Sequence, residues 1–124
     1  MGAKPAGFAA RSEAVIQRDI VSYLKAVLMP THRVLAIPNS ARRTANGYAG
    51  NAVAGLTKGA PDLQIVGKGQ CWFIEVKRAR GQLSQDQQCF RDWCITPGNT
   101  PLAVCRSVED VRAALEHWGL ETRE

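Results

Sequence analysis

The chain has 124 residues, of which 45% are hydrophobic and 6% aromatic, with 16 Lys and Arg against 11 Asp and Glu. This length and composition fit one domain over residues 1–124 and exclude two full domains or a disordered chain. No apolar run approaches the ~20 residues of a membrane span, and the N-terminus lacks the apolar centre of a secretory signal. The sequence therefore predicts a cytosolic protein with no membrane partner.

The net charge of +5 is concentrated in the middle of the chain. Residues 31–80 hold eight basic and two acidic side chains, while the remainder is nearly balanced. Positive charge confined to one segment is expected where a protein meets a polyanion, although a clustered solubility charge would give the same pattern. The identity of the two acids, Asp62 and Glu75, favours the polyanion.

Residues 11–29 are predicted to form the first helix, with Ser12 as N-cap, apolar residues at helical spacing and Pro30 at its end. Glu13 lies near the middle of the apolar stripe, and Gln17 lies one turn further along the same face. A carboxylate on the inward face needs a partner. A simple preference for the positive helix N-terminus would place Glu13 anywhere around the first turn, so this explanation fits less well.

A strand is predicted at 32–38, followed by a glycine- and asparagine-rich loop at 39–59 that carries Arg42 and Arg43. A loop of this length in a small domain is usually functional or mobile, and we expect it to order on binding its partner. The next elements are strands at 62–67 and 71–77, which are joined by a glycine-containing turn and form a hairpin.

The rest of the chain alternates helix and strand. A helix at 84–94 opens with a capping box, Ser84-x-x-Gln87, and turns Gln87 toward the same face as Phe90 and Cys94. A strand at 101–106 follows, and Ser107 then caps a last helix that Gly119 stops. The predicted order is α-β-β-β-α-β-α.

The hairpin determines the relation between the two middle acids. A turn centred on Lys68-Gly69 places Asp62 directly opposite Glu75, with Cβ atoms roughly 5 Å apart on one face. Two carboxylates this close favour a bound cation, and Mg²⁺ accepts one or two carboxylates together with water and phosphate oxygens. Lys77, two residues after Glu75, shares their face, which suits a hydrolytic site.

An ordinary charge cluster on a solvated sheet face is the alternative. It is disfavoured because Phe73, Ile74 and Val76 make the second strand apolar on both faces, so the charged face is expected to be partly covered. The two histidines, His32 and His117, have no partner at a useful spacing and are predicted to lie on a strand and on a helix surface.

The four cysteines form no C-x-x-C pair and stand mostly in apolar stretches. Buried, reduced thiols are therefore predicted in preference to a zinc site or a disulfide framework.

Four sequence blocks resemble a known family. Pro61-Asp62 and Glu75-Val76-Lys77 are similar to the PD-(D/E)xK nuclease motif. The wider set resembles the VRR-NUC family, and it consists of Ser12-Glu13-x-x-x-Gln17, Lys58-Gly59-Ala60-Pro61-Asp62-Leu63, Ile74-Glu75-Val76-Lys77 and Gly81-Gln82-Leu83-Ser84-x-x-Gln87. The resemblance covers about residues 11–118 and implies an α/β, restriction-endonuclease-like core with a mixed central sheet flanked by helices.

The resemblance also implies roles for individual residues. Asp62, Glu75 and the backbone carbonyl of Val76 would bind Mg²⁺ or Mn²⁺, Glu13 would bind the metal directly or through water, and Lys77 would position the attacking water. Gln87 would reach toward the site, with Gln17 and Ser84 supporting it. The basic residues of the middle segment would hold the DNA backbone without reading sequence: Arg42, Arg43, Lys58, Arg78 and Arg80.

The function implied is a metal-dependent, structure-specific DNA endonuclease. Small stand-alone members of the family suggest a homodimer acting on branched DNA such as four-way (Holliday) junctions. Two alternatives remain open. One is a flap, nick or fork nuclease, or an exonuclease, with the same chemistry. The other is a binding module that does not cut, although carboxylates near phosphate would weaken pure binding.

Overall fold

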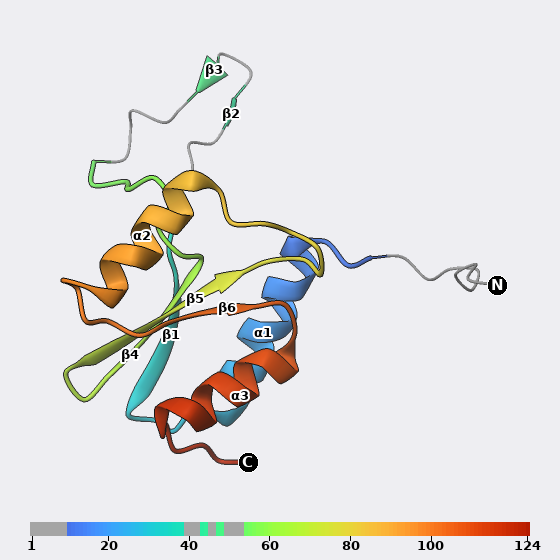
Figure 1. The fold of residues 1–124 in the computed structure, drawn as a ribbon. Coiled ribbons are helices and arrows are strands. Elements are labelled where there is room, and N and C mark those ends of the chain that lie inside the picture. Colours follow the sequence, from blue (N-terminus) through green and yellow to red (C-terminus); the bar gives the residue numbers. More distant parts are fainter. Residues whose placement is uncertain (1–9, 39–42, 45–46, 49–53) are drawn as a thin grey trace.

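The computed structural model describes residues 10–38, 43–44, 47–48 and 54–124. It is a mixed α/β fold in which three helices cover a four-stranded mixed sheet (Figure 1). The elements in chain order are α1 (Glu13–Val27), β1 (His32–Ala36), β2 (Arg43–Thr44), β3 (Gly47–Tyr48), β4 (Leu63–Gly67), β5 (Gln70–Val76), α2 (Gln85–Ile95), β6 (Leu102–Cys105) and α3 (Val108–Trp118). Among the described residues, no helix has both the length and the apolar character needed to cross a membrane.

The sheet has the strand order β1-β4-β5-β6, with β5 and β6 parallel and the other pairs antiparallel. Helix α2 connects the two parallel strands. The β4–β5 hairpin turns on Lys68 and Gly69, both at positive φ, as a two-residue primed turn requires. Its register pairs Gly67 with Gln70 and Leu63 with Ile74, which confirms the predicted register.

Helices α1 and α3 lie side by side on one face of the sheet, and α2 lies on the other (Figure 1). Alternation along β4 and β5 sends one set of side chains into the core between the sheet and α1 and α3. The buried residues with the least exposure include Ile20, Leu24, Leu63, Ile65, Ile74, Val111 and Leu115. The opposite alternation directs Phe73 and Glu75 toward α2, so the acid predicted for the site faces that helix.

The first helix is shorter than predicted at both ends. It begins at Glu13 because Ser12 is the N-cap, its hydroxyl accepting a hydrogen bond from the Val15 N–H at 3.2 Å. It ends at Val27 because the backbone of Leu28 is extended and bridges to Thr122 near the C-terminus. The predicted apolar stripe is confirmed, since its four members are all buried.

Two other sequence expectations need correction. The segment predicted as a plain loop contains a short antiparallel ladder between β2 and β3, in which Thr44 and Tyr48 belong to residue types that favour extended backbone. The prediction of buried thiols is wrong for Cys89, which is exposed because α2 presents only one face to the sheet; Cys94 and Cys105 are buried, and Cys71 is partly buried.

Candidate active site

Asp62 and Glu75 form a carboxyl pair where β4 begins and β5 ends. The hairpin register continues one residue past Leu63 and Ile74, and it sets these two acids opposite each other. The Glu75 side chain lies in a position only 3% exposed. Burial, followed by the charge of Asp62 and a hydrogen bond with it, raises the pKa of Glu75 to about 8, against a smaller lowering by Lys77. At neutral pH Glu75 therefore retains its proton in the metal-free protein.

Proline at position 61 shapes the pair. Extended two residues past its last pair, Leu63 with Ile74, the register would bring Pro61 opposite Val76, where proline has no N–H to donate to the Val76 carbonyl. The Val76 N–H donates to the Asp62 carboxylate, Oδ2, at 2.8 Å. The Pro-Asp sequence thus ends the ladder, orients the Asp62 side chain along β5, and leaves the Val76 carbonyl without a ladder donor from this strand.

Gln87 uses both ends of its side-chain amide. Its Oε1 accepts from the Ser84 backbone N–H at 2.8 Å, and the Ser84 hydroxyl accepts from the Gln87 N–H at 3.2 Å, so the predicted capping box is confirmed. Its Nε2 donates to Glu75 Oε2 at 3.1 Å. A capping box tolerates Glu or Gln at this position, but only Gln can also donate to a carboxylate. The cap of α2 and the orientation of Glu75 therefore depend on one side chain.

Lys77 connects the pair to the first helix. The residue is only 8% exposed, and its Nζ lies 4.0 Å from Glu13 Oε2 in the first turn of α1. Its backbone N–H donates to the Cys105 carbonyl on β6 at 3.0 Å, which fixes the strand end from which the side chain departs. Glu13 thus has a cationic partner, but its side chain is 44% exposed and is not buried on the inward face as the sequence predicted.

Glycine at position 59 sets the approach of the chain to the site. Gly59 has φ +79°, and a Cβ there would come within 2.2 Å of the Asp86 carbonyl oxygen and 2.8 Å of the Gln87 nitrogen. The segment that leads to Asp62 therefore packs directly on the first turn of α2. Gly59 belongs to the Lys58–Leu63 block, but its role as a packing contact was not foreseen, because nothing in the sequence indicates which helix it meets.

The structure therefore brings five predicted residues to one place, where the end of β5 meets the starts of α1 and α2: Glu13, Asp62, Glu75, Lys77 and Gln87. Gln17 is half-buried one turn along α1, and within the described chain no hydrogen bond joins it to the other five. Ser84 acts through the cap of α2.

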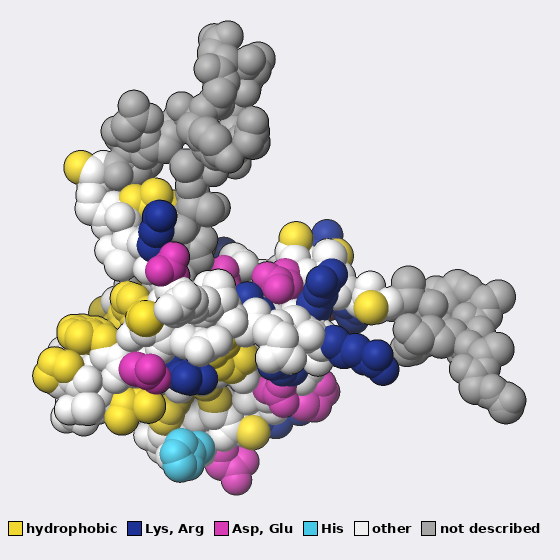
Figure 2. Space-filling model, turned by 45° about the horizontal axis from the view of Figure 1, so that its top comes forward, with side chains coloured by type: hydrophobic (Ala, Val, Ile, Leu, Met, Phe, Trp, Pro, Cys, Tyr) yellow, Lys and Arg dark blue, Asp and Glu magenta, His cyan; other side chains and the backbone are white. Residues whose placement is uncertain are grey.

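Three of the predicted DNA-binding residues are exposed near this site: Lys58, Arg78 and Arg80. Figure 2 shows Lys and Arg side chains gathering on the right of the view, around the start of α1 and the chain that follows β5. Arg42 lies outside the described residues, and of Arg43 only its backbone in β2 is described. The surface beside the carboxyl pair can therefore attract a polyanion.

The donor atoms suit a hard divalent cation. Asp62 and Glu75 offer carboxylate oxygens, and a cation there would offset the burial and the repulsion from Asp62 that raise the pKa of Glu75. In the described part of the chain, no group of three or more His, Cys, Asp or Glu is arranged to hold a metal ion. Glu13 in particular pairs with Lys77. A cation at this site would be held by Asp62 and Glu75 and would complete its shell with water, which Mg²⁺ readily retains; whether Glu13 binds the metal, directly or through water, stays a prediction.

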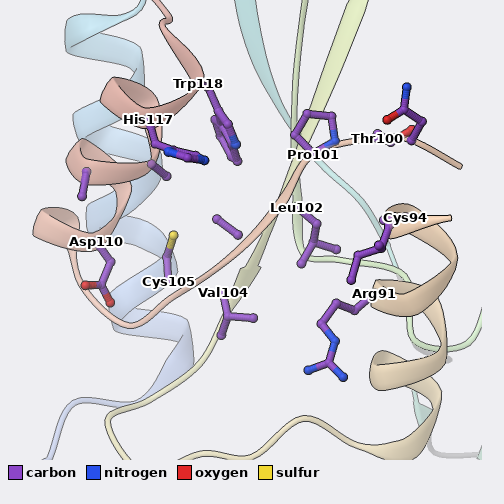
Figure 3. Close-up of a pocket in the computed structure, with 15 residues that line it drawn as sticks. Arg91, Cys94, Thr100, Pro101, Leu102, Val104, Cys105, Asp110, His117 and Trp118 are labelled. Carbon is purple, nitrogen blue, oxygen red and sulfur yellow. The ribbon is translucent and has the colours of Figure 1, made fainter.

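A groove of about 800 Å³ lies elsewhere, along the free edge of β6 between α2 and α3. Figure 3 shows Arg91 and Cys94 of α2 on one side and Asp110, His117 and Trp118 of α3 on the other. Its acid is already engaged, since Asp110 accepts from the Arg106 backbone N–H at 2.8 Å. The groove lacks the paired carboxylates and the lysine, so the chemistry points to the end of β5.

Comparisons of the chain with protein-family models, with curated proteins and with solved structures found no match. Function is therefore inferred from the residues of the site and not from fold-level likeness.

Proposed function

We propose that the chain is a divalent-metal-dependent nuclease that hydrolyses phosphodiester bonds of DNA, with a PD-(D/E)xK core of the VRR-NUC kind. One observation carries the proposal: a carboxyl pair, in which Glu75 is buried and Asp62 is partly buried, meets a buried lysine and a glutamine that orients Glu75. Structural sites rarely bury like charges together, whereas catalytic sites use such arrangements to shift pKa values.

Asp62 and Glu75, with the Val76 carbonyl, would hold Mg²⁺ or Mn²⁺. Such an ion, when bound, acidifies a water molecule and neutralises charge on phosphate oxygens. Lys77 would position the attacking water and stabilise the negative charge that develops on the phosphate. Gln87 keeps the Glu75 carboxylate turned toward the site. Lys58, Arg78 and Arg80 bind the DNA backbone and position it without reading bases.

The proposed substrate is branched DNA, above all a four-way junction. Resolving a junction takes two symmetric cuts, and one chain offers one candidate site, so we propose a homodimer in which each protomer cuts one strand. A flap, nick or fork nuclease would use the same residues, and only substrate preference separates these activities.

The test compares wild type with Glu75→Ala on labelled junction, flap, nicked and linear duplex DNA, each with Mg²⁺, with Mn²⁺ or with EDTA. We expect cleavage only with metal, strongest on the junction, and a loss of at least about 100-fold in Glu75→Ala because an ion held by one carboxylate binds weakly and is misplaced. Glu116→Ala is the matched control, because Glu116 is an exposed acid on α3.

Four outcomes would count against parts of this proposal. Cleavage in EDTA, or cleavage unaffected by Glu75→Ala, would contradict the mechanism. Binding of every substrate without cutting would favour a non-cleaving module. Preference for flap, nicked or linear ends would retain the chemistry and reject the junction.

A further inference from the structure

The guanidinium of Arg106, the residue after β6, is bound to the chain that leaves β5. Its Nη1 donates to the carbonyls of Arg78 at 2.7 Å, Gly81 at 2.8 Å and Ala79 at 3.3 Å. The Gly81 N–H donates to the Arg78 carbonyl at 2.9 Å, so residues 78–81 form a tight turn. A single side chain thus holds three of the four carbonyls of this turn.

The turn starts directly after Lys77. The backbone N–H of Lys77 donates to the Cys105 carbonyl. Cys105 therefore holds the end of β5, and the next residue, Arg106, holds the turn that follows. Arg106 is itself fixed, because its own N–H donates to Asp110 Oδ2 at 2.8 Å in the first turn of α3. In the described part of the chain the Arg106 guanidinium forms no ion pair with an acidic side chain. Its positive charge therefore interacts with the carbonyls of the turn.

These bonds order the turn; they do not rescue buried groups. Arg78, Ala79 and Arg80 are exposed, and water could satisfy their carbonyls. The guanidinium holds the backbone of the turn in one conformation, and this fixes the positions from which Arg78 and Arg80 project. A pre-ordered pair of cations binds an extended polyanion more tightly than the same pair on a freely moving turn, because less conformational entropy is lost on binding.

We propose that Arg106 is a positioning residue, which fixes the turn at 78–81 so that Arg78 and Arg80 meet the phosphodiester backbone beside Lys77. The inference rests on the proposed function, since it names the residue that organises the DNA contacts of that same site. Arg106 acts through the turn and does not itself touch DNA.

The experiment is a mutant cycle on the dissociation constant of a fluorescent four-way junction, measured in EDTA so that no cleavage occurs. The proteins are wild type, Arg106→Met, Arg78→Ala/Arg80→Ala and the triple variant. We expect Arg106→Met to weaken binding about fivefold or more in the wild-type background and less than about twofold once both arginines are absent. An equal loss in both backgrounds would overturn the proposal, because it would mean that Arg106 binds DNA directly.

Two further measurements keep the test decisive. Hydrogen exchange of the Gly81 amide should be at least about tenfold faster in Arg106→Met, and unchanged exchange would overturn the proposal without reference to DNA. Arg106→Lys retains a charged donor group and should recover part of the affinity and of the Gly81 protection. Thermal unfolding of each variant checks that the chain is folded. If Arg106→Met is unfolded, Arg106→Lys replaces it in the mutant cycle.

The outcomes separate this inference from the proposed function. If wild type cuts DNA and the mutant cycle is additive, only the proposed role of Arg106 is rejected. Wild type that binds without cutting, with a coupled cycle, would reject hydrolysis and retain Arg106. Wild type that does not bind DNA would reject both.

Discussion

Burial in the fold changes the pKa of Glu75, and this change affects how the residue could bind a metal. Its pKa is raised from 4.5 to about 8, first by burial and then by Asp62. A metal must displace the retained proton, so metal binding is expected to strengthen as pH rises. In the proposed mechanism, the side chain that is neutral without metal would become an anionic ligand of the bound ion.

The raised pKa makes the stability of the metal-free protein depend on pH. Between 4.5 and about 8 the folded chain holds a proton on Glu75 that the unfolded chain releases. The free energy of unfolding therefore falls as pH rises, by at most about 1.4 kcal/mol per pH unit; the contribution is complete below the unfolded pKa and is lost as pH passes the folded pKa.

Urea unfolding in EDTA at about pH 6 and about pH 9 measures this effect. Glu75→Gln, which carries a neutral amide, should lose less stability across the interval than wild type does. Glu116→Gln, on the exposed surface of α3, should behave as wild type. Equal pH dependence in wild type and Glu75→Gln would contradict the buried, protonated state.

At this scale the sequence already singled out the acids, the lysine and the glutamine. It did not indicate that one amide of Gln87 serves both the cap and Glu75, because two bonds of one side chain need the actual separation of α2 from β5. Arg106 was predicted only as the end of a strand, since neither its spacing nor its neighbours identify three carbonyls 25 to 28 positions away.

Among the elements, the contact between the Lys58–Asp62 segment and α2 is the most sensitive to a small change. Gly59→Ala introduces both a positive-φ strain and a clash with the backbone of Asp86. We expect it to destabilise the fold by about 2 kcal/mol or more, from the left-handed conformation and from displacement of the first turn of α2.

Gly55→Ala is the matched control, because Gly55 has φ +86° and no atom of the described residues lies within 4 Å of the position that a Cβ would take there. It should show only the strain, about 1 kcal/mol, and retain full activity. Urea unfolding and junction cleavage of both variants measure the difference. Equal destabilisation by the two substitutions would show that the contact with α2 is dispensable.

Element type and order were predictable because hydrophobic periodicity, caps and turn residues act locally. Ser12, Ser84 and Ser107 cap the helices as expected, and Lys68-Gly69 forms the hairpin turn. The short ladder of β2 and β3 was not predicted, since pairs of two residues carry no periodic signal.

For the whole molecule, the homodimer is the testable consequence of the proposed junction substrate. Light scattering of the protein at micromolar concentration should give a mass near twice the 13.5 kDa of one chain. Junction DNA should be released as a paired product, because two sites cut within one complex. A monomeric mass together with efficient paired cutting would contradict the homodimer.

Sequence alone determined the order of the three helices and of the four strands of the main sheet, the hairpin register and the candidate acids, since each depends on spacing along a strand or helix. Only the tertiary structure decided that Glu75 is buried against Gln87 and that Glu13 meets Lys77. It also decided that Gly59 packs on the first turn of α2 and that Arg106 binds the turn after β5. The reason is physical: burial, pKa and packing depend on which elements approach one another, and that approach is set by the core as a whole.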